Sequence, residues 1–204
     1  MSKEDKDSKN PLLFMNEASI SVMLTSFMTA VVIFFIGLLL TGDPVLQMRL
    51  RVPLVLLFFS AFGFLYSTLV YANASGEIAR LKKNKFDRQM TIGNILSEFF
   101  GVYCLVFAVP IVVLGYSPDK ILSFFVLVIS LFSFLIYHLM GYSILERYLK
   151  RSAFYLTLSM ILSTYLFVFI FFYVEREVLF YTLSAFLIFQ IITLILILLQ
   201  KKEK

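Results

Sequence analysis

The chain has 204 residues, of which 60% are hydrophobic and only 15% are charged, and its net charge is +5. An ordinary soluble domain is about half apolar and a quarter charged, so this composition excludes a water-soluble protein. A single cysteine, Cys104, and a single histidine, His138, exclude an internal disulfide and any site that needs two histidines from this chain.

Six apolar runs of about 20 residues follow one another, each long enough for a helix to cross about 30 Å of hydrocarbon. They predict an all-α integral membrane protein, a compact bundle of six transmembrane helices. The first run is too long for a signal-peptide core and is expected to be retained. The expected helices lie at about residues 18–40, 52–73, 92–115, 121–143, 152–174 and 178–199.

The charged segments divide the chain into a short tail at 1–16, a six-helix domain at 17–200 and a basic tail at 201–204. Lysine and arginine are unequally distributed between the two sides of the membrane that six helices would give. The side with the two tails and the second and fourth loops has 14, and the side with the other loops has four. Because cytoplasmic segments carry this excess, both termini are predicted to be cytoplasmic. We expect a multi-pass protein of the cell membrane rather than of an internal membrane.

The longest polar stretch is a basic loop at 74–91, expected on the cytoplasmic side. Its basic side chains are candidates for docking lipid head groups or a partner protein. They also account for the positive charge of the protein without a nucleic-acid partner. The candidate docking residues are Arg80, Lys82, Lys83, Lys85 and Arg88.

Polar residues recur at helical spacing within several runs, and the third run has the clearest stripe. There Asn94, Glu98 and Gly101 follow one another at intervals of four and three residues, which places them on one helix face. Glu98 is the deepest carboxylate of the chain. Gly93 and Gly101 are predicted to allow close helix packing, and Pro110 to kink the same helix.

Polar stripes on several helices predict a polar pocket that opens to the cytoplasm. An Asn-x-x-x-Glu pair occurs twice, and carboxylate and amide oxygens suit a hard cation. The sequence does not identify a metal. The candidate cation- or proton-binding residues are Glu98, Asn94, Asn73, Glu77, Glu146 and His138.

Structural roles are the alternative for each of these candidates. Glu77 and Glu146 have Arg80 and Arg147 close in sequence as ion-pair partners. Glu98 could be a buried, hydrogen-bonded side chain. His138 could be a packed one.

The stripe around Glu98 favours a small cation or proton channel or transporter, because ionisable residues within a membrane helix are functional candidates. A channel would need a homo-oligomer, since so few helices rarely enclose a pore. The alternatives are a non-catalytic scaffold or anchor subunit with a partner membrane subunit, and a lipid-binding protein. No catalytic residue, enzymatic activity or cofactor is expected, since the chain lacks nucleotide-binding, hydrolase and metalloprotease motifs.

Overall fold

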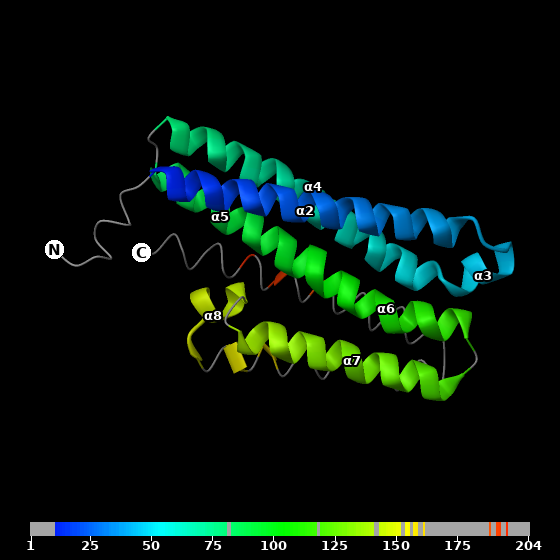
Figure 1. The fold of residues 1–204 in the computed structure, drawn as a ribbon. Coiled ribbons are helices and arrows are strands. Elements are labelled where there is room, and N and C mark those ends of the chain that lie inside the picture. Colours follow the sequence, from blue (N-terminus) through cyan, green and yellow to red (C-terminus); the bar gives the residue numbers. More distant parts are fainter. Residues whose placement is uncertain are drawn as a thin grey trace. The chain divides into compact units, whose positions relative to one another are not determined.

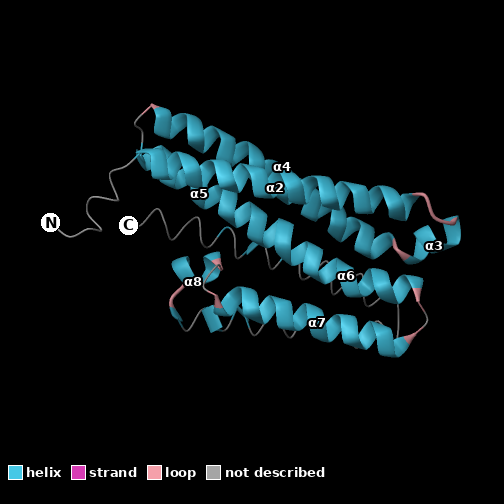
Figure 2. Cartoon of the chain, viewed as in Figure 1, coloured by secondary structure: helices cyan, strands magenta, loops and turns pink. Residues whose placement is uncertain are grey.

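The computed structural model describes residues 11–80, 83–117, 119–140 and 143–151, together with scattered positions between 154 and 195. All regular secondary structure in these ranges is helical (Figures 1 and 2). The elements are α2 (Pro11–Leu40), α3 (Pro44–Arg49), α4 (Arg51–Ala79), α5 (Lys83–Leu96), the π-helix η1 (Ser97–Val102), α6 (Tyr103–Tyr116), α7 (Lys120–Leu139) and α8 (Ile144–Tyr148).

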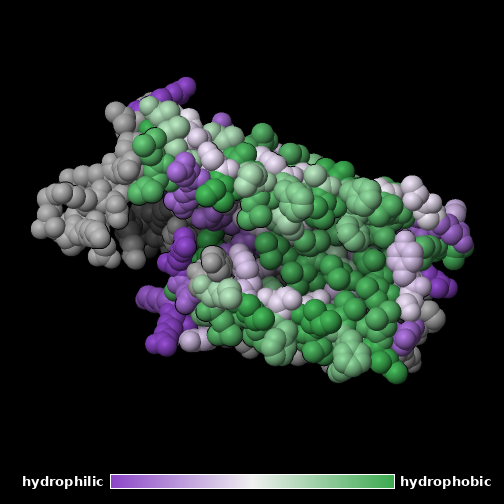
Figure 3. Space-filling model, in the orientation of Figure 1, coloured by the Kyte–Doolittle hydropathy of each residue, from purple (hydrophilic) through white to green (hydrophobic). Residues whose placement is uncertain are grey.

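Four helical stretches in the described ranges are long and apolar enough to cross a membrane. Hydrophobic side chains cover their sides, and hydrophilic side chains gather at their ends (Figure 3). These stretches coincide with the first four predicted spans, whereas the fifth and sixth predictions, at 152–174 and 178–199, fall almost entirely outside the described residues. The four stretches are Leu12–Leu40, Arg51–Ala79, Lys83–Tyr116 and Phe124–Arg147.

Most of the expected 74–91 loop is helical. The helix α4 continues to Ala79, and α5 begins at Lys83, so the reversal of the chain is short. Lysine, arginine, glutamate and glutamine are good helix formers, and each helix end also buries an apolar face. The basic side chains of Lys83, Lys85 and Arg88 therefore lie on the first turns of α5.

The described helices divide into two compact units. The first holds α2, most of α4, α5 and η1, and the second holds α6 from Val106 together with α7 and α8. In the first unit α2 and α4 run alongside each other, and α5 lies beside them at one end (Figure 1).

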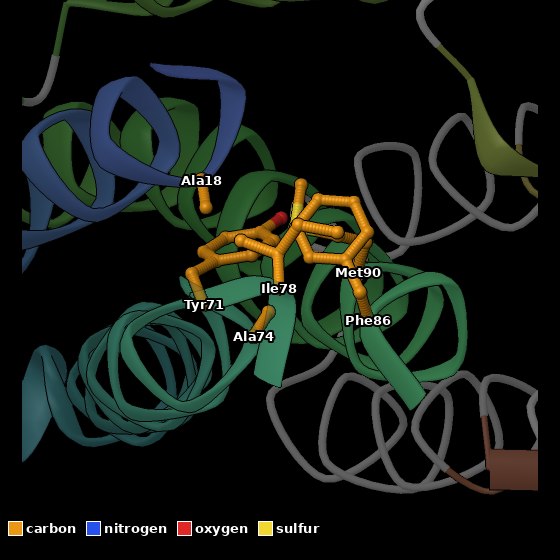
Figure 4. Close-up of a cluster of buried hydrophobic side chains, with 6 residues drawn as sticks. All are labelled: Ala18, Tyr71, Ala74, Ile78, Phe86 and Met90. Atoms are coloured by element: carbon orange, nitrogen blue, oxygen red, sulfur yellow. The ribbon is translucent and has the colours of Figure 1, made fainter. Parts of the chain in front are cut away.

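Apolar side chains of α2, α4 and α5 pack against one another at one end of the first unit. Six side chains converge there from all three helices (Figure 4). The ring of Phe14 meets that of Phe86 edge-on, with 5.3 Å between centroids. The cluster, named here the end cluster, consists of Ala18, Tyr71, Ala74, Ile78, Phe86 and Met90.

The hydroxyl groups along α2 are satisfied mainly within their own helix. Ser21, Thr25 and Thr29 each donate to the carbonyl four residues earlier, at 2.9, 2.7 and 2.7 Å. The polar stripe of this helix is therefore largely self-contained. It makes one link to α4, where the Thr68 hydroxyl donates to Thr25 Oγ1 at 2.7 Å.

Replacing Thr68 with valine should remove this link at nearly constant volume. We expect a loss of about 0.6 kcal/mol, because interhelical hydrogen bonds in membranes are worth about that much on average. The measurement is reversible unfolding in mixed micelles. Ser133→Ala is the control, since the exposed Ser133 hydroxyl donates to the carbonyl of Ile129 in its own helix at 2.9 Å. Equal losses for the two variants would contradict a tertiary role for Thr68.

Candidate functional site

The helices α4 and α5–η1 approach each other closely along a seam of glycines. A Cβ atom added to Gly63 would lie 2.6 Å from the backbone nitrogen of Gly101. One added to Gly93 would lie 2.5 Å from the ring of Tyr71, and one added to Gly101 would lie 2.6 Å from the ring of Phe64. The close packing predicted at Gly93 and Gly101 is confirmed.

Two buried serines of α4 use this proximity to hydrogen-bond the opposite backbone. Ser60 Oγ donates to the carbonyl of Gly101 at 2.8 Å, and Ser67 Oγ donates to the carbonyl of Gly93 at 2.6 Å. The glycines expose their carbonyl groups to a neighbouring helix because they carry no side chain. The seam is therefore both packed and hydrogen-bonded.

The two sides of the seam differ in length by one residue. Ser60 and Ser67 are seven residues apart, whereas Gly93 and Gly101 are eight apart. Positions eight apart in a regular α-helix point in directions about 80° apart, so one of the two glycines would turn away from α4. The π-helix η1 absorbs the extra residue, because its wider turn returns the chain to the same face.

The backbone of η1 shows the expected hydrogen-bond pattern. The N–H of Tyr103 donates to the carbonyl of Glu98, five residues earlier, rather than to the residue four earlier. Single π-turns within α-helices occur often at functional sites. This element was not predicted from the sequence. The one signal that could have indicated it is the difference in spacing, seven residues between Ser60 and Ser67 against eight between Gly93 and Gly101.

Glu98 is buried within η1. Its residue is 2% exposed, and the fully buried Tyr103 donates its hydroxyl to Glu98 Oε1 at 2.8 Å. Glu98 lies in the continuous helical stretch Lys83–Tyr116, which has 34 residues, at the point where the polar helix α5 gives way to the apolar second half. The structure thus buries an ionisable side chain near the beginning of the apolar part of this helix.

A second group of polar side chains lies one turn before Glu98. Tyr71 of α4 donates its hydroxyl to Asn94 Oδ1 at 2.5 Å and lies 3.4 Å from Ser97 Oγ. The Ser97 hydroxyl in turn donates to the carbonyl of Asn94 at 3.1 Å. Of the predicted residues, Asn94 and Glu98 therefore lie one turn apart on the same helix, and each accepts a hydrogen bond from a tyrosine hydroxyl, Asn94 from Tyr71 and Glu98 from Tyr103.

The predicted residues of α4 lie nearer the end of the helix. Asn73 is exposed, and Glu77 is half-buried. Glu77 Oε1 lies 3.9 Å from an Arg80 guanidinium nitrogen, which is the local ion pair that the structural alternative predicts. Glu77 Oε2 is buried, and no described residue donates a hydrogen bond to it.

The two remaining predicted residues belong to the second unit. His138 is 4% exposed, and its Nδ1–H donates to the carbonyl of Phe134 at 2.9 Å. The rings of Phe134 and Phe154 lie 4.5 and 6.2 Å from its own. Glu146 is exposed in the first turn of α8. This packing resembles the structural role that the sequence offered as an alternative for His138.

Most of the predicted docking residues are exposed near the turn between α4 and α5. Arg80 has 71% of its side chain accessible. The Lys83 Nζ atom lies 5.2 Å from the centre of the Phe14 ring, a cation–π distance. Lys82 lies outside the described residues. The exposed residues are Arg80, Lys83, Lys85 and Arg88.

Within the described residues, no three histidine, cysteine, aspartate or glutamate side chains come together where they could share a metal ion. The buried carboxylate of Glu98 accepts a hydrogen bond from the hydroxyl of Tyr103. A hydroxyl donor of this kind suits a carboxyl group that binds a proton, whereas calcium and magnesium need several oxygen ligands.

Comparison with known proteins adds no relative to this picture. The four long apolar helices identify a multi-pass membrane protein. The assignment of a function beyond that rests on the buried polar residues of the chain. No family model, no curated protein and no solved structure matches the sequence or the fold.

Proposed function

We propose that the protein carries protons, or a small cation in their place, across the membrane, and that Glu98 is the group that binds the ion. The observation that supports this proposal is the burial of Glu98 within a membrane-spanning helix, with the hydroxyl of Tyr103 donating to its carboxylate. Both termini and the basic turn between α4 and α5 are assigned to the cytoplasmic side, from the distribution of lysine and arginine.

A buried carboxylate is costly in an apolar helix. Transferring an ionised carboxylate out of water costs several kcal/mol unless hydrogen bonds or a bound cation compensate it. An apolar residue at the same position would hold the helix at no such cost. The presence of a buried glutamate at a position that an apolar residue could fill therefore favours a role in binding an ion.

The surroundings of Glu98 favour a proton over a divalent cation. Calcium takes six to eight oxygen ligands, and magnesium needs a near-ideal octahedron. The amide oxygen of Asn94 already accepts a hydrogen bond from Tyr71. One carboxylate with a tyrosine donor binds a single proton without further ligands, so proton transport is the first activity to test.

Replacing Glu98 with glutamine should abolish transport in a folded protein. Glutamine keeps the shape of the side chain and an oxygen that accepts from Tyr103, but it does not exchange a proton in this way. The measurement is proton and cation flux into proteoliposomes under an imposed gradient. Flux through Glu98→Gln should fall to the level of protein-free vesicles.

Asp87→Asn is the matched control for this experiment, because Asp87 is an exposed carboxylate on the preceding helix. It should keep wild-type flux. Wild-type flux in Glu98→Gln would contradict the proposal, and so would the absence of any flux through the wild-type protein.

A non-catalytic scaffold or anchor subunit is the second candidate, favoured by the exposed basic side chains near the turn between α4 and α5. Arg80, Lys85 and Arg88 could dock an acidic partner or anionic lipid there. Purification from native membranes should then return a stoichiometric partner that is lost when the three residues are replaced by glutamine. Recovery of the protein alone would contradict this candidate.

A further inference from the structure

The bond between Tyr103 and Glu98 depends on the local form of the helix. The two residues are five positions apart, and in a regular α-helix their side chains would point in directions about 140° apart. The wider turn of η1 brings them onto the same side, where the hydroxyl reaches Oε1 at 2.8 Å. Sequence periodicity alone assigns Tyr103 to a different face from Glu98.

The ring of Tyr103 is packed, and the helix that carries the pair is bonded to α4. The ring is fully buried and lies 5.4 Å, between centroids, from the fully buried ring of Phe99 in η1. The backbone of η1 is linked to α4 by the hydrogen bond from Ser60 to the carbonyl of Gly101. The hydroxyl of Tyr103 is therefore carried by a packed ring and donates to Oε1 of Glu98.

We propose that Tyr103 is the positioning residue of the site, and that its hydroxyl holds the carboxylate of Glu98 in one orientation for ion binding. This inference rests on the proposed role of Glu98. The hydroxyl donates to Oε1, so the bound proton is carried by Oε2. Tyr103 does not bind or release the transported proton. Its hydroxyl restricts the rotation of the Glu98 carboxyl group.

Tyr103→Phe removes the hydroxyl and keeps the ring. The infrared carboxyl band of Glu98 can be assigned as the band that disappears in Glu98→Gln. In Tyr103→Phe this band should shift to higher wavenumber, because a carbonyl group that loses a hydrogen bond vibrates at higher frequency. Flux should fall about tenfold, the usual effect of losing a hydrogen bond to an ionisable group.

Tyr66→Phe is the control, because it removes the hydroxyl of an exposed tyrosine of α4. It should leave the Glu98 band and the flux unchanged. If Tyr103→Phe does not fold, Glu98→Asp serves instead, since its shorter side chain withdraws the carboxyl group from the hydroxyl and should give the same shift and loss of flux.

The outcomes distinguish the two proposals. Loss of flux in Glu98→Gln, together with a shifted band and reduced flux in Tyr103→Phe, supports both. Loss of flux in Glu98→Gln with an unshifted band or full flux in Tyr103→Phe overturns the role of Tyr103 and leaves that of Glu98 standing. Full flux in Glu98→Gln overturns the proposed function, and the positioning role with it.

Discussion

Gly63→Ala should be one of the most damaging single-methyl additions in the described part of the protein. The new Cβ atom would lie 2.6 Å from the backbone nitrogen of Gly101 and 2.7 Å from the carbonyl carbon of Phe100. Backbone atoms of a helix do not move aside as the end of a flexible side chain does, so α4 and η1 would have to separate. Overpacking of this kind costs about 1–3 kcal/mol, and we expect the upper end of that range.

Gly37→Ala is the matched control for this experiment. Within the described residues, a Cβ atom added at Gly37 would meet no atom within 4 Å beyond its own helix backbone and chain neighbours, and alanine is the better helix former by about 1 kcal/mol. The control should therefore be neutral or stabilising. Reversible unfolding in mixed micelles measures both variants. A free energy of unfolding for Gly63→Ala equal to that of Gly37→Ala would contradict the close approach of the two helices.

The other two glycines of the seam should be less sensitive. A Cβ atom at Gly93 would meet the ring of Tyr71, and one at Gly101 would meet the ring of Phe64. A ring can rotate or shift by a few tenths of an ångström, so alanine at either position should cost less than at Gly63. Gly93→Ala should in addition disturb the bond from Tyr71 to Asn94.

Phe86→Ala should release the first turns of α5. Phe86 is buried in the end cluster and meets Phe14 edge-on. Truncating a buried phenylalanine to alanine costs about 3–5 kcal/mol in soluble cores, through lost contacts and the cavity that remains. Because the basic residues around Phe86 contribute few apolar contacts, we expect the loss to appear as local unfolding of this end of α5.

Hydrogen exchange and limited trypsin digestion would measure this release. Amide exchange across Lys83–Met90 should quicken, and cleavage after Lys85 and Arg88 should increase. Phe34→Ala is the control, since Phe34 is 66% exposed on α2. Unchanged exchange and cleavage in Phe86→Ala would show that the segment does not depend on this anchor.

The first four spans could be predicted from the sequence because their signal is the length of an apolar run. The ends of the helices were harder to predict, since a helix that leaves the apolar layer keeps its hydrogen bonds while its composition becomes polar. The segment at 74–91 illustrates this: its charged residues resemble a loop, while Ile78, Phe86 and Met90 bury a helical face. The fifth and sixth predicted spans remain predictions.

The site was predictable in part for a related reason. Glu98 and Asn94 share a stripe at ordinary helical spacing, which a single sequence reveals. Tyr103 does not fall on that stripe, because its contact with Glu98 depends on η1. The π-helix is in turn favoured by the contacts between α4 and the two glycines. These contacts join residues far apart in the sequence, so no local sequence pattern reveals them. A contact produced by an irregular turn is therefore the kind of feature that periodicity misses.

The glycines of the seam are spaced one residue further apart than the serines that they face, and relatives of this protein need not share that extra residue. A one-residue insertion in a regular helix turns everything that follows by about 100°, whereas η1 confines the change to its own turn. Relatives that lack one residue between Ser97 and Val102 could keep both glycine contacts with an ordinary α-helix. Their counterparts of Glu98 and Tyr103 would then be four residues apart and still on one face. An alignment of such relatives with this chain should therefore place a one-residue gap in this segment. A search that forbids a gap inside a membrane helix would miss them.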